Sequence, residues 1–289
     1  MLIDIGDVRL FVDTAGSQWV ADGQELRERP TAILLHGGPG FDHSLLKSTV
    51  GPALAEFAYV VYVDQRGHGR SDDGNDDQWV LDTWATDVHR LVEALGLERP
   101  VVLGVSFGAF VALKYASMFP SEPAATIAVS PAARFTRDLI LDKFDELGGP
   151  DVRAVAARDL DDPSPEARED WFRVCFPLAV GQSVPPEIRA RAIWRPLVNE
   201  RFYALHGEYR AFDLRRDLAA VRRSVLIIAG GRDPITPAEA AAEVAAAIPS
   251  EYAALRLIEN AGHGIIWDHP DELVELVRSF LATLSTADS

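Results

Sequence analysis

The chain has 289 residues and a formal net charge of −16, because 44 acidic residues outnumber 28 basic ones. This charge disfavours nucleic acid and anionic membrane surfaces as partners, since both repel an acidic protein. Apolar residues make up 48% of the chain, which is enough to bury a sizeable core. The single cysteine, Cys175, excludes an intramolecular disulfide and a zinc cluster, and we expect it to be a small core residue.

The N-terminal residues 1–14 alternate acidic and apolar side chains and lack the basic start and long apolar run of a signal peptide. No stretch approaches the run of about 18 consecutive apolar residues that a membrane span requires. We therefore expect a cytoplasmic protein that has no membrane partner and acts as a monomer or homodimer.

The first half of the chain alternates predicted strands with predicted helices. Residues 2–13 favour a hairpin that turns at Gly6-Asp7. Short apolar runs predict strands at 31–35, 59–63, 101–105 and 125–129, and helical spacing predicts helices at 83–97 and 107–119. The strand at 31–35 ends in the glycine loop His36-Gly37-Gly38-Pro39-Gly40.

Between residues 132 and 216 this alternation stops, charge density rises and prolines become frequent, which predicts a helical insertion. Alternation resumes with a strand at 225–229, a helix at 237–248, a strand at 254–258 and a helix at 270–284. The pattern predicts an α/β fold whose mostly parallel sheet is flanked by helices. We expect residues 1–131 and 217–289 to form the core, and residues 132–216 to form a helical cap inserted after the sixth strand.

Gly104-Val105-Ser106-Phe107-Gly108 matches the G-x-S-x-G nucleophile elbow, in which small residues allow a serine to stand on a sharp turn between a strand and a helix. A predicted strand precedes this motif and a predicted helix follows it, as the elbow requires. The helix would also direct the positive end of its dipole toward developing negative charge. We predict that Ser106 is a nucleophile.

A serine hydroxyl needs a base and a group that orients the base. His263 is the best placed histidine, because the loop Asn260-Ala261-Gly262-His263-Gly264 follows a predicted strand, whereas His269 precedes a proline at a helix start. Asp233 follows the strand at 225–229, and Asp138 is the alternative if the acid follows the earlier strand. Asp233 is preferred because the chain order Ser, Asp, His is that of the hydrolase elbow enzymes.

Acyl transfer also needs donors for the oxyanion of the tetrahedral intermediate. We predict that the backbone N–H groups of Phe107 and Gly38 supply them, with Gly37 beside the substrate. The sequence has no paired spacing of metal ligands, and this chemistry requires no cofactor or metal.

Taken together, the chain resembles the α/β-hydrolase superfamily over nearly its whole length outside the insertion. The segments 36–40 and 64–71, HGGPG and DQRGHGRS, are similar to those of its proline iminopeptidase branch. That resemblance implies a serine peptidase that releases N-terminal proline, with His68 and Arg70 as structural residues of a loop near the site. The chain departs from that branch at Phe107, where the branch has tryptophan, and it lacks the Trp-x-x-Trp-Glu signature.

We therefore expect hydrolysis of a carboxylic ester or lactone through an acyl-enzyme, with Trp171, Phe172 and Trp194 of the cap contacting substrate. The expected partner is a small-molecule ester, lactone or short peptide. Proline iminopeptidase activity is the alternative, supported by the two loop motifs and by the acidic cap residues Asp161, Asp162, Glu166, Glu169 and Asp170. A ligand receptor on a hydrolase scaffold is an alternative of another class.

Overall fold

A computed structural model describes residues 1–180 and 185–287. Its centre is an eight-stranded sheet in the order β1-β2-β6-β5-β7-β8-β9-β10. The strands are β1 (Leu2–Asp4), β2 (Arg9–Ala15), β5 (Thr31–Leu35), β6 (Tyr59–Asp64), β7 (Val101–Val105), β8 (Ala125–Val129), β9 (Val225–Gly230) and β10 (Ala253–Ile258). The pairs β1-β2 and β2-β6 are antiparallel, and all pairs from β6 to β10 are parallel. The predicted mostly parallel sheet is confirmed.

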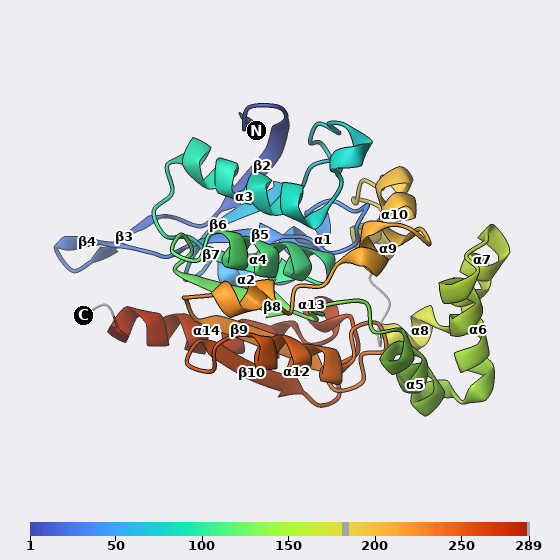
Figure 1. The fold of residues 1–289 in the computed structure, drawn as a ribbon. Helices are drawn as coiled ribbons and strands as arrows, with labels where there is room; N and C mark the ends of the chain where they lie inside the picture. The colour runs from blue at the N-terminus through green and yellow to red at the C-terminus, as the bar shows by residue number, and fades with distance from the viewer. Residues whose placement is uncertain (181–184, 288–289) are drawn as a thin grey trace.

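Helices cover both faces of the sheet (Figure 1). One face packs against α3 (Leu81–Leu95), α4 (Phe107–Met118) and α12 (Ala238–Ala247). The other packs against α1 (Ser44–Ser48), α2 (Gly51–Leu54), α13 (Ile265–Asp268) and α14 (Pro270–Ala287). Successive side chains of a strand point to opposite faces, so in β5 Ile33 joins one apolar cluster and Leu34 the other.

The segment between β8 and β9 is inserted after the sixth strand of the large sheet. In order it contains α5 (Arg137–Gly148), α6 (Pro150–Asp161), α7 (Pro165–Val174), α8 (Phe176–Ala179), α9 (Pro186–Arg189), α10 (Pro196–Tyr203), α11 (Glu208–Ala211) and the 3-10 helix η2 (Asp217–Ala220). Prolines begin four of these helices, where the fixed φ of proline and its missing N–H are tolerated. The prolines of this segment thus mark helix starts.

Most of the inserted helices lie beyond one end of the sheet, at the right of Figure 1. The two ends of the segment lie together. The Leu214 amide donates to the Ala133 carbonyl at 2.7 Å, and the backbones of Arg134 and Asp213 form an isolated antiparallel β-bridge. Cys175, in this segment, is fully buried, as predicted. Within residues 1–180 and 185–287, no helix has both the length and the apolar character needed to cross a bilayer.

The ribbon of β3 (Trp19–Asp22) and β4 (Glu25–Glu28) is a feature that the sequence pattern does not predict. These strands extend away from the large sheet (Figure 1) and are mostly exposed. Because they bury almost no apolar surface, they show none of the apolar alternation from which strands are recognised. The 3-10 turn η1 (Asp76–Gln78) is another short element of this kind.

Candidate active site

Ser106 stands on a sharp turn between β7 and α4, with φ 53° and ψ −116°, in a region that residues with side chains seldom occupy. A Cβ atom on Gly104 would collide with the carbonyl oxygen of Gly108, and a Cβ atom on Gly108 would collide with that of Leu35. Both glycines of the G-x-S-x-G pattern are therefore required by close packing. The turn leaves the Ser106 side chain at the edge where the strands end.

The structure brings together the three side chains that the sequence singles out. The Nε2 atom of His263 lies 2.9 Å from Ser106 Oγ, and its Nδ1 atom lies 2.8 Å from Asp233 Oδ2. Ser106 is 8% exposed and Asp233 is fully buried. This geometry allows the hydroxyl proton to pass to an imidazole that a carboxylate orients.

The Asp233 carboxylate is fixed by its own chain. Its Oδ1 atom accepts hydrogen bonds from the amides of Ile235 and Thr236 at 2.8 and 3.0 Å, and its Oδ2 atom accepts one from the Thr236 hydroxyl at 2.8 Å. Sequence reasoning missed Thr236. Its position three residues after an aspartate, in Asp-Pro-Ile-Thr, is the spacing at which aspartates cap turns, and that spacing could have indicated it.

The alternative candidates lie elsewhere. Asp138 is on α5, where its side chain is 88% exposed and ion-paired with Arg137. His269 ends α13 and lies 3.8 Å from Glu272. Neither forms the contacts that Asp233 and His263 form.

The glycine loop lies against the elbow. A Cβ atom on Gly37 would be 3.5 Å from Ser106 Cβ. His36 holds this loop, since its Nδ1 atom donates to the Gly37 carbonyl at 2.9 Å and its Nε2 atom accepts from the Gln65 amide at 3.3 Å. Burial lowers the pKa of His36, so the ring is neutral at neutral pH and can donate and accept in this way.

The inserted segment holds the same loop from the other side. The Tyr203 hydroxyl donates to the Gly38 carbonyl at 3.0 Å, and the Asn199 amide donates to the Pro39 carbonyl at 3.0 Å. The Arg195 backbone N–H donates to the Gly40 carbonyl at 2.7 Å. Sequence reasoning missed these contacts, although the spacing of Asn199 and Tyr203 places both on one face of the helix that Pro196 begins.

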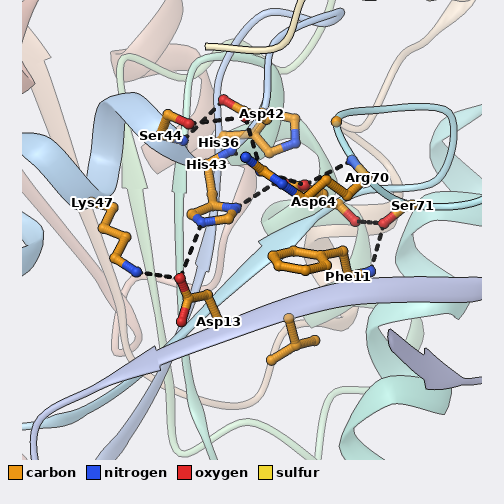
Figure 2. Close-up of polar contacts among 12 residues, drawn as sticks. Phe11, Asp13, His36, Asp42, His43, Ser44, Lys47, Asp64, Arg70 and Ser71 are labelled. Atoms are coloured by element: carbon orange, nitrogen blue, oxygen red, sulfur yellow. Dashed lines mark hydrogen bonds and ion pairs between the residues drawn. The ribbon is translucent and has the colours of Figure 1, made fainter. Parts of the chain in front are cut away.

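A buried polar network ties the loop after β5 to the loop after β6 (Figure 2). Asp64 Oδ1 accepts from His43 Nδ1 at 2.6 Å, and Asp64 Oδ2 accepts from the Arg70 amide at 2.9 Å. Arg70 also reaches Asp42 at 3.3 Å. Burial by itself raises the pKa of Asp64, but the hydrogen bonds from His43 and from the Arg70 amide help to outweigh burial, and the pKa is lowered to about 2. The network holds Asp64 charged and braces the loop that carries Gly38.

His68 fills the space behind the elbow. It is fully buried, its ring stacks on that of Phe107 with centroids 5.4 Å apart, and its Nδ1 atom donates to the Arg66 carbonyl at 2.8 Å. Burial lowers the pKa of His68 to about 3. These contacts support the structural role expected for His68, and the Asp42 and Asp64 contacts support the same role for Arg70.

The aromatic residues predicted to contact substrate lie in two places. Trp194 packs against the glycine loop, with its ring centroid 4.6 Å from that of Phe41. Trp171 and Phe172 are on α7, 5.3 Å apart and edge to face, and Phe172 is 53% exposed. The neighbouring helix α8 reaches the site, because the Ala179 carbonyl accepts from the His263 amide at 2.7 Å. Substrate contact by these aromatic residues stays a prediction.

Across the described ranges 1–180 and 185–287, no group of three or more His, Cys, Asp or Glu side chains is arranged to hold a metal ion.

Comparison with known proteins identifies the family. The family model described as alpha/beta hydrolase fold matches residues 30–270. The chain is 25% identical over 270 residues to human monoacylglycerol lipase ABHD6, covering 90% of this chain and 78% of that protein. Its structure is similar to that of proline iminopeptidase from Mycobacterium smegmatis, with a TM-score of 0.79, 22% identity, and coverage of 100% of this chain and 99% of that one.

It is also similar to Est816, described as an N-acyl homoserine lactone degrading enzyme, with a TM-score of 0.72, 22% identity, and coverage of 97% of this chain and 100% of that one. At 22% identity the solved structures show the fold alone, whereas the family model shows the family. The match spans most of the chain and includes the elbow, Asp233 and His263. The chain belongs to the α/β-hydrolase family.

Proposed function

We propose that the protein is a serine hydrolase that cleaves a carboxylic ester or lactone through an acyl-enzyme, with Ser106 as nucleophile, His263 as general base and Asp233 as the orienting acid. The observation that carries this proposal is the position of His263, whose two ring nitrogens lie 2.9 Å from Ser106 Oγ and 2.8 Å from Asp233 Oδ2. A serine activated in this way is suited to attack an ester carbonyl.

In the first step, Ser106 Oγ bonds to the carbonyl carbon while His263 Nε2 takes the hydroxyl proton. The carbonyl oxygen becomes an oxyanion that accepts hydrogen bonds from the backbone N–H groups of Gly38 and Phe107. Phe107 is the first residue of α4, so its N–H has no acceptor within the helix and is available. The bond from the carbonyl carbon to the leaving oxygen then breaks, His263 returns the proton to that oxygen, and an acyl-enzyme remains. In the second half, water attacks the acyl carbon as His263 takes its proton, the bond to Ser106 Oγ breaks, and His263 returns the proton to Oγ as the acid leaves.

The inserted segment, residues 132–216, is proposed to act as a cap that shapes the substrate site. Its α8 contacts the His263 loop and its Trp194 packs on the glycine loop. The aromatic side chains of Trp171, Phe172 and Trp194 would favour an apolar acyl or alcohol group. An ester is supported by the similarity to a monoacylglycerol lipase, and a lactone by the similarity to Est816.

Proline iminopeptidase is the second candidate, supported by the two loop motifs and by the similarity to the mycobacterial enzyme. It requires free acidic groups for the amine of the substrate. Asp161 is ion-paired with Arg137, and Asp170 is ion-paired with Arg158 and Arg173. Ester or lactone hydrolysis is placed first because Phe107 stands where that branch has tryptophan and the chain lacks the Trp-x-x-Trp-Glu signature.

The test is a panel of p-nitrophenyl esters, homoserine and macrocyclic lactones, and proline p-nitroanilide, measured with the wild type and Ser106→Ala. A control is Ser130→Ala, since Ser130 is also buried, also has positive φ and directly follows the neighbouring strand β8. We expect turnover of esters or lactones that Ser106→Ala lowers by about 10⁶-fold, as for other serine triads, and that Ser130→Ala preserves. Turnover of proline p-nitroanilide alone would replace the proposal by the second candidate.

The receptor alternative makes a different prediction. It requires saturable binding of a small ester or lactone with no release of product by the wild type. Binding measured by calorimetry without turnover on any substrate of the panel would overturn the hydrolase proposal.

A further inference from the structure

Successive carbonyl groups of the glycine loop each accept a hydrogen bond from one short stretch of the inserted segment. The Gly38 carbonyl accepts from the Tyr203 hydroxyl, the Pro39 carbonyl from the Asn199 side chain and the Gly40 carbonyl from the Arg195 backbone, at 3.0, 3.0 and 2.7 Å. The donors lie on α10 or immediately before it, more than 150 residues from the loop in sequence. An inserted helix thus holds the loop that carries a proposed oxyanion donor.

Holding these carbonyls fixes the direction of the Gly38 N–H. In a trans peptide the C=O and the following N–H point in opposite directions, so His36, by holding the Gly37 carbonyl, sets one side of this peptide plane. Gly38 has φ +128°, and because glycine has no Cβ atom its backbone can rotate easily about φ to other conformations. Tyr203 blocks that rotation by holding the next carbonyl. The Gly38 amide is fixed from both sides.

The Tyr203 hydroxyl is itself well placed. Its ring packs edge to face on Phe202 and Tyr209, with centroids 5.1 and 4.8 Å away. Burial raises the pKa of Tyr203 to about 12, so the hydroxyl keeps its proton and remains a donor throughout the neutral range. Asn199 lies one helical turn earlier on the same face of α10. A rigid helix face presents both donors.

We propose that α10 clamps the oxyanion loop, with Tyr203 and Asn199 as positioning residues that aim the Gly38 N–H at the reacting carbonyl oxygen. This inference rests on the proposed function, since it requires an oxyanion formed by attack of Ser106. It gives the inserted segment a part in catalysis besides substrate selection. The hydrogen bond from the Gly38 N–H stabilises the transition state rather than the bound ester, because the oxyanion forms only in the transition state and the tetrahedral intermediate.

Tyr203→Phe removes the hydroxyl and keeps the ring packing, and Asn199→Leu removes the donor and keeps the volume. The matched control is Tyr115→Phe, which removes a buried hydroxyl near the far end of α4, about 13 Å along the helix from Ser106. We measure kcat, KM and the thermal midpoint with the best p-nitrophenyl ester. We also measure inhibition by a trifluoromethyl ketone, to which Ser106 adds to form a hemiketal oxyanion while His263 takes the proton, and by the product carboxylate.

Losing a whole oxyanion donor costs about 10² to 10³ in rate, and a loosened donor should cost less. We expect each variant to lower kcat about tenfold, the pair to lower it about a hundredfold, and KM to change less than twofold. Affinity for the trifluoromethyl ketone should fall by the same factor as kcat/KM, while affinity for the product carboxylate and the activity of Tyr115→Phe stay unchanged.

Wild-type kcat in both Tyr203→Phe and Asn199→Leu, or a loss that appears only in KM, would overturn the clamp. A thermal midpoint that falls while trifluoromethyl ketone affinity stays at the wild-type value would show a purely structural role and would also overturn it. These outcomes differ from failure of the proposed function, which would appear as turnover that survives Ser106→Ala.

Discussion

The contact between His263 and Asp233, 2.8 Å from Nδ1 to Oδ2, decides which nitrogen of the imidazole carries the proton. The carboxylate accepts a hydrogen bond from Nδ1–H and so keeps the proton on Nδ1, which leaves Nε2 free to accept a hydrogen bond from the Ser106 hydroxyl at 2.9 Å. Because Asp233 is fully buried and its oxygens are held by Ile235 and Thr236, the carboxylate cannot turn away from the ring. The site is therefore organised before substrate arrives.

Asp233→Asn should remove this control with little change of shape. An asparagine amide can present an N–H to Nδ1, which favours the tautomer that cannot accept the serine proton. We expect kcat to fall about 10⁴-fold, the magnitude known for the same change in a serine protease triad. The rate of ester hydrolysis checks this, with Asp138→Asn as the control because Asp138 is an exposed aspartate of α5. Equal activity of the two variants would count against the role of Asp233.

Substitution of the elbow glycines should separate folding from catalysis. In Gly104→Ala the new methyl group would overlap the Gly108 carbonyl oxygen, and the backbone would have to move to relieve the overlap. We therefore expect the free energy of unfolding to fall by about 2 kcal/mol or more. In Gly37→Ala the nearest atom is the Val105 carbonyl oxygen at 3.2 Å, a milder contact beside Ser106. Urea titration should therefore find Gly104→Ala the less stable of the two, with Gly37→Ala affected mainly in kcat. The reverse order of stability would contradict this packing.

The buried histidines should make the fold sensitive to acid. Burial lowers the pKa of His68 to about 3 and also lowers that of His36, so the unfolded chain binds protons more readily than the folded one. The stability that the neutral His68 ring contributes is complete above about pH 6.5 and is lost as pH falls toward its folded pKa, by about 1.4 kcal/mol per pH unit. His36 contributes in the same direction. His68→Gln should lose less stability than the wild type between pH 6 and pH 4.

Urea titrations at several pH values measure these slopes, and the exposed His206→Gln is the control. His206→Gln should keep the wild-type slope. Parallel slopes for wild type and His68→Gln across that range would rule out His68 as a source of the acid sensitivity, whatever the stability of the variant at pH 7.

The Cys175 thiol should be unreactive in the folded protein. It is fully buried in the inserted segment, and burial raises its pKa to about 12, so at pH 8 it has neither access nor thiolate character. A disulfide reagent that releases a coloured thiolate should find no reactive thiol in the native protein and one equivalent in 6 M urea. Rapid reaction of the thiol well below the thermal and urea midpoints, where the protein as a whole is folded, would contradict this prediction. It would mean that the inserted segment opens on its own.

Much of the core could be predicted because its elements are buried and bounded. The predicted strands at 31–35, 101–105 and 125–129 coincide with β5, β7 and β8, each an apolar run between breaking residues. The positions of Ser106, Asp233 and His263 also followed from local signals, since each stands just after a strand and parallel strands end at one edge. Local sequence was enough where the chain itself determines the geometry.

The contacts of α10 could not be predicted in the same way. Tyr203 and Asn199 act on Gly38 and Pro39, which are more than 150 residues away in sequence, and this pairing depends on how the inserted helices pack against the sheet. The β3-β4 ribbon was missed for another reason, because its polar, exposed strands have no apolar period. The α10 contacts could not be predicted because they depend on tertiary packing, and the β3-β4 ribbon could not be predicted because its strands are not buried.

The most direct test of the account is the site of acylation. The wild type, mixed with a p-nitrophenyl ester and quenched in acid within the first turnover, should gain the mass of one acyl group, and proteolysis should locate it on the peptide that contains Ser106. Ser106→Ala should gain none and release no burst of p-nitrophenol. Acylation at another residue, or turnover by Ser106→Ala at the wild-type rate, would contradict the proposed mechanism.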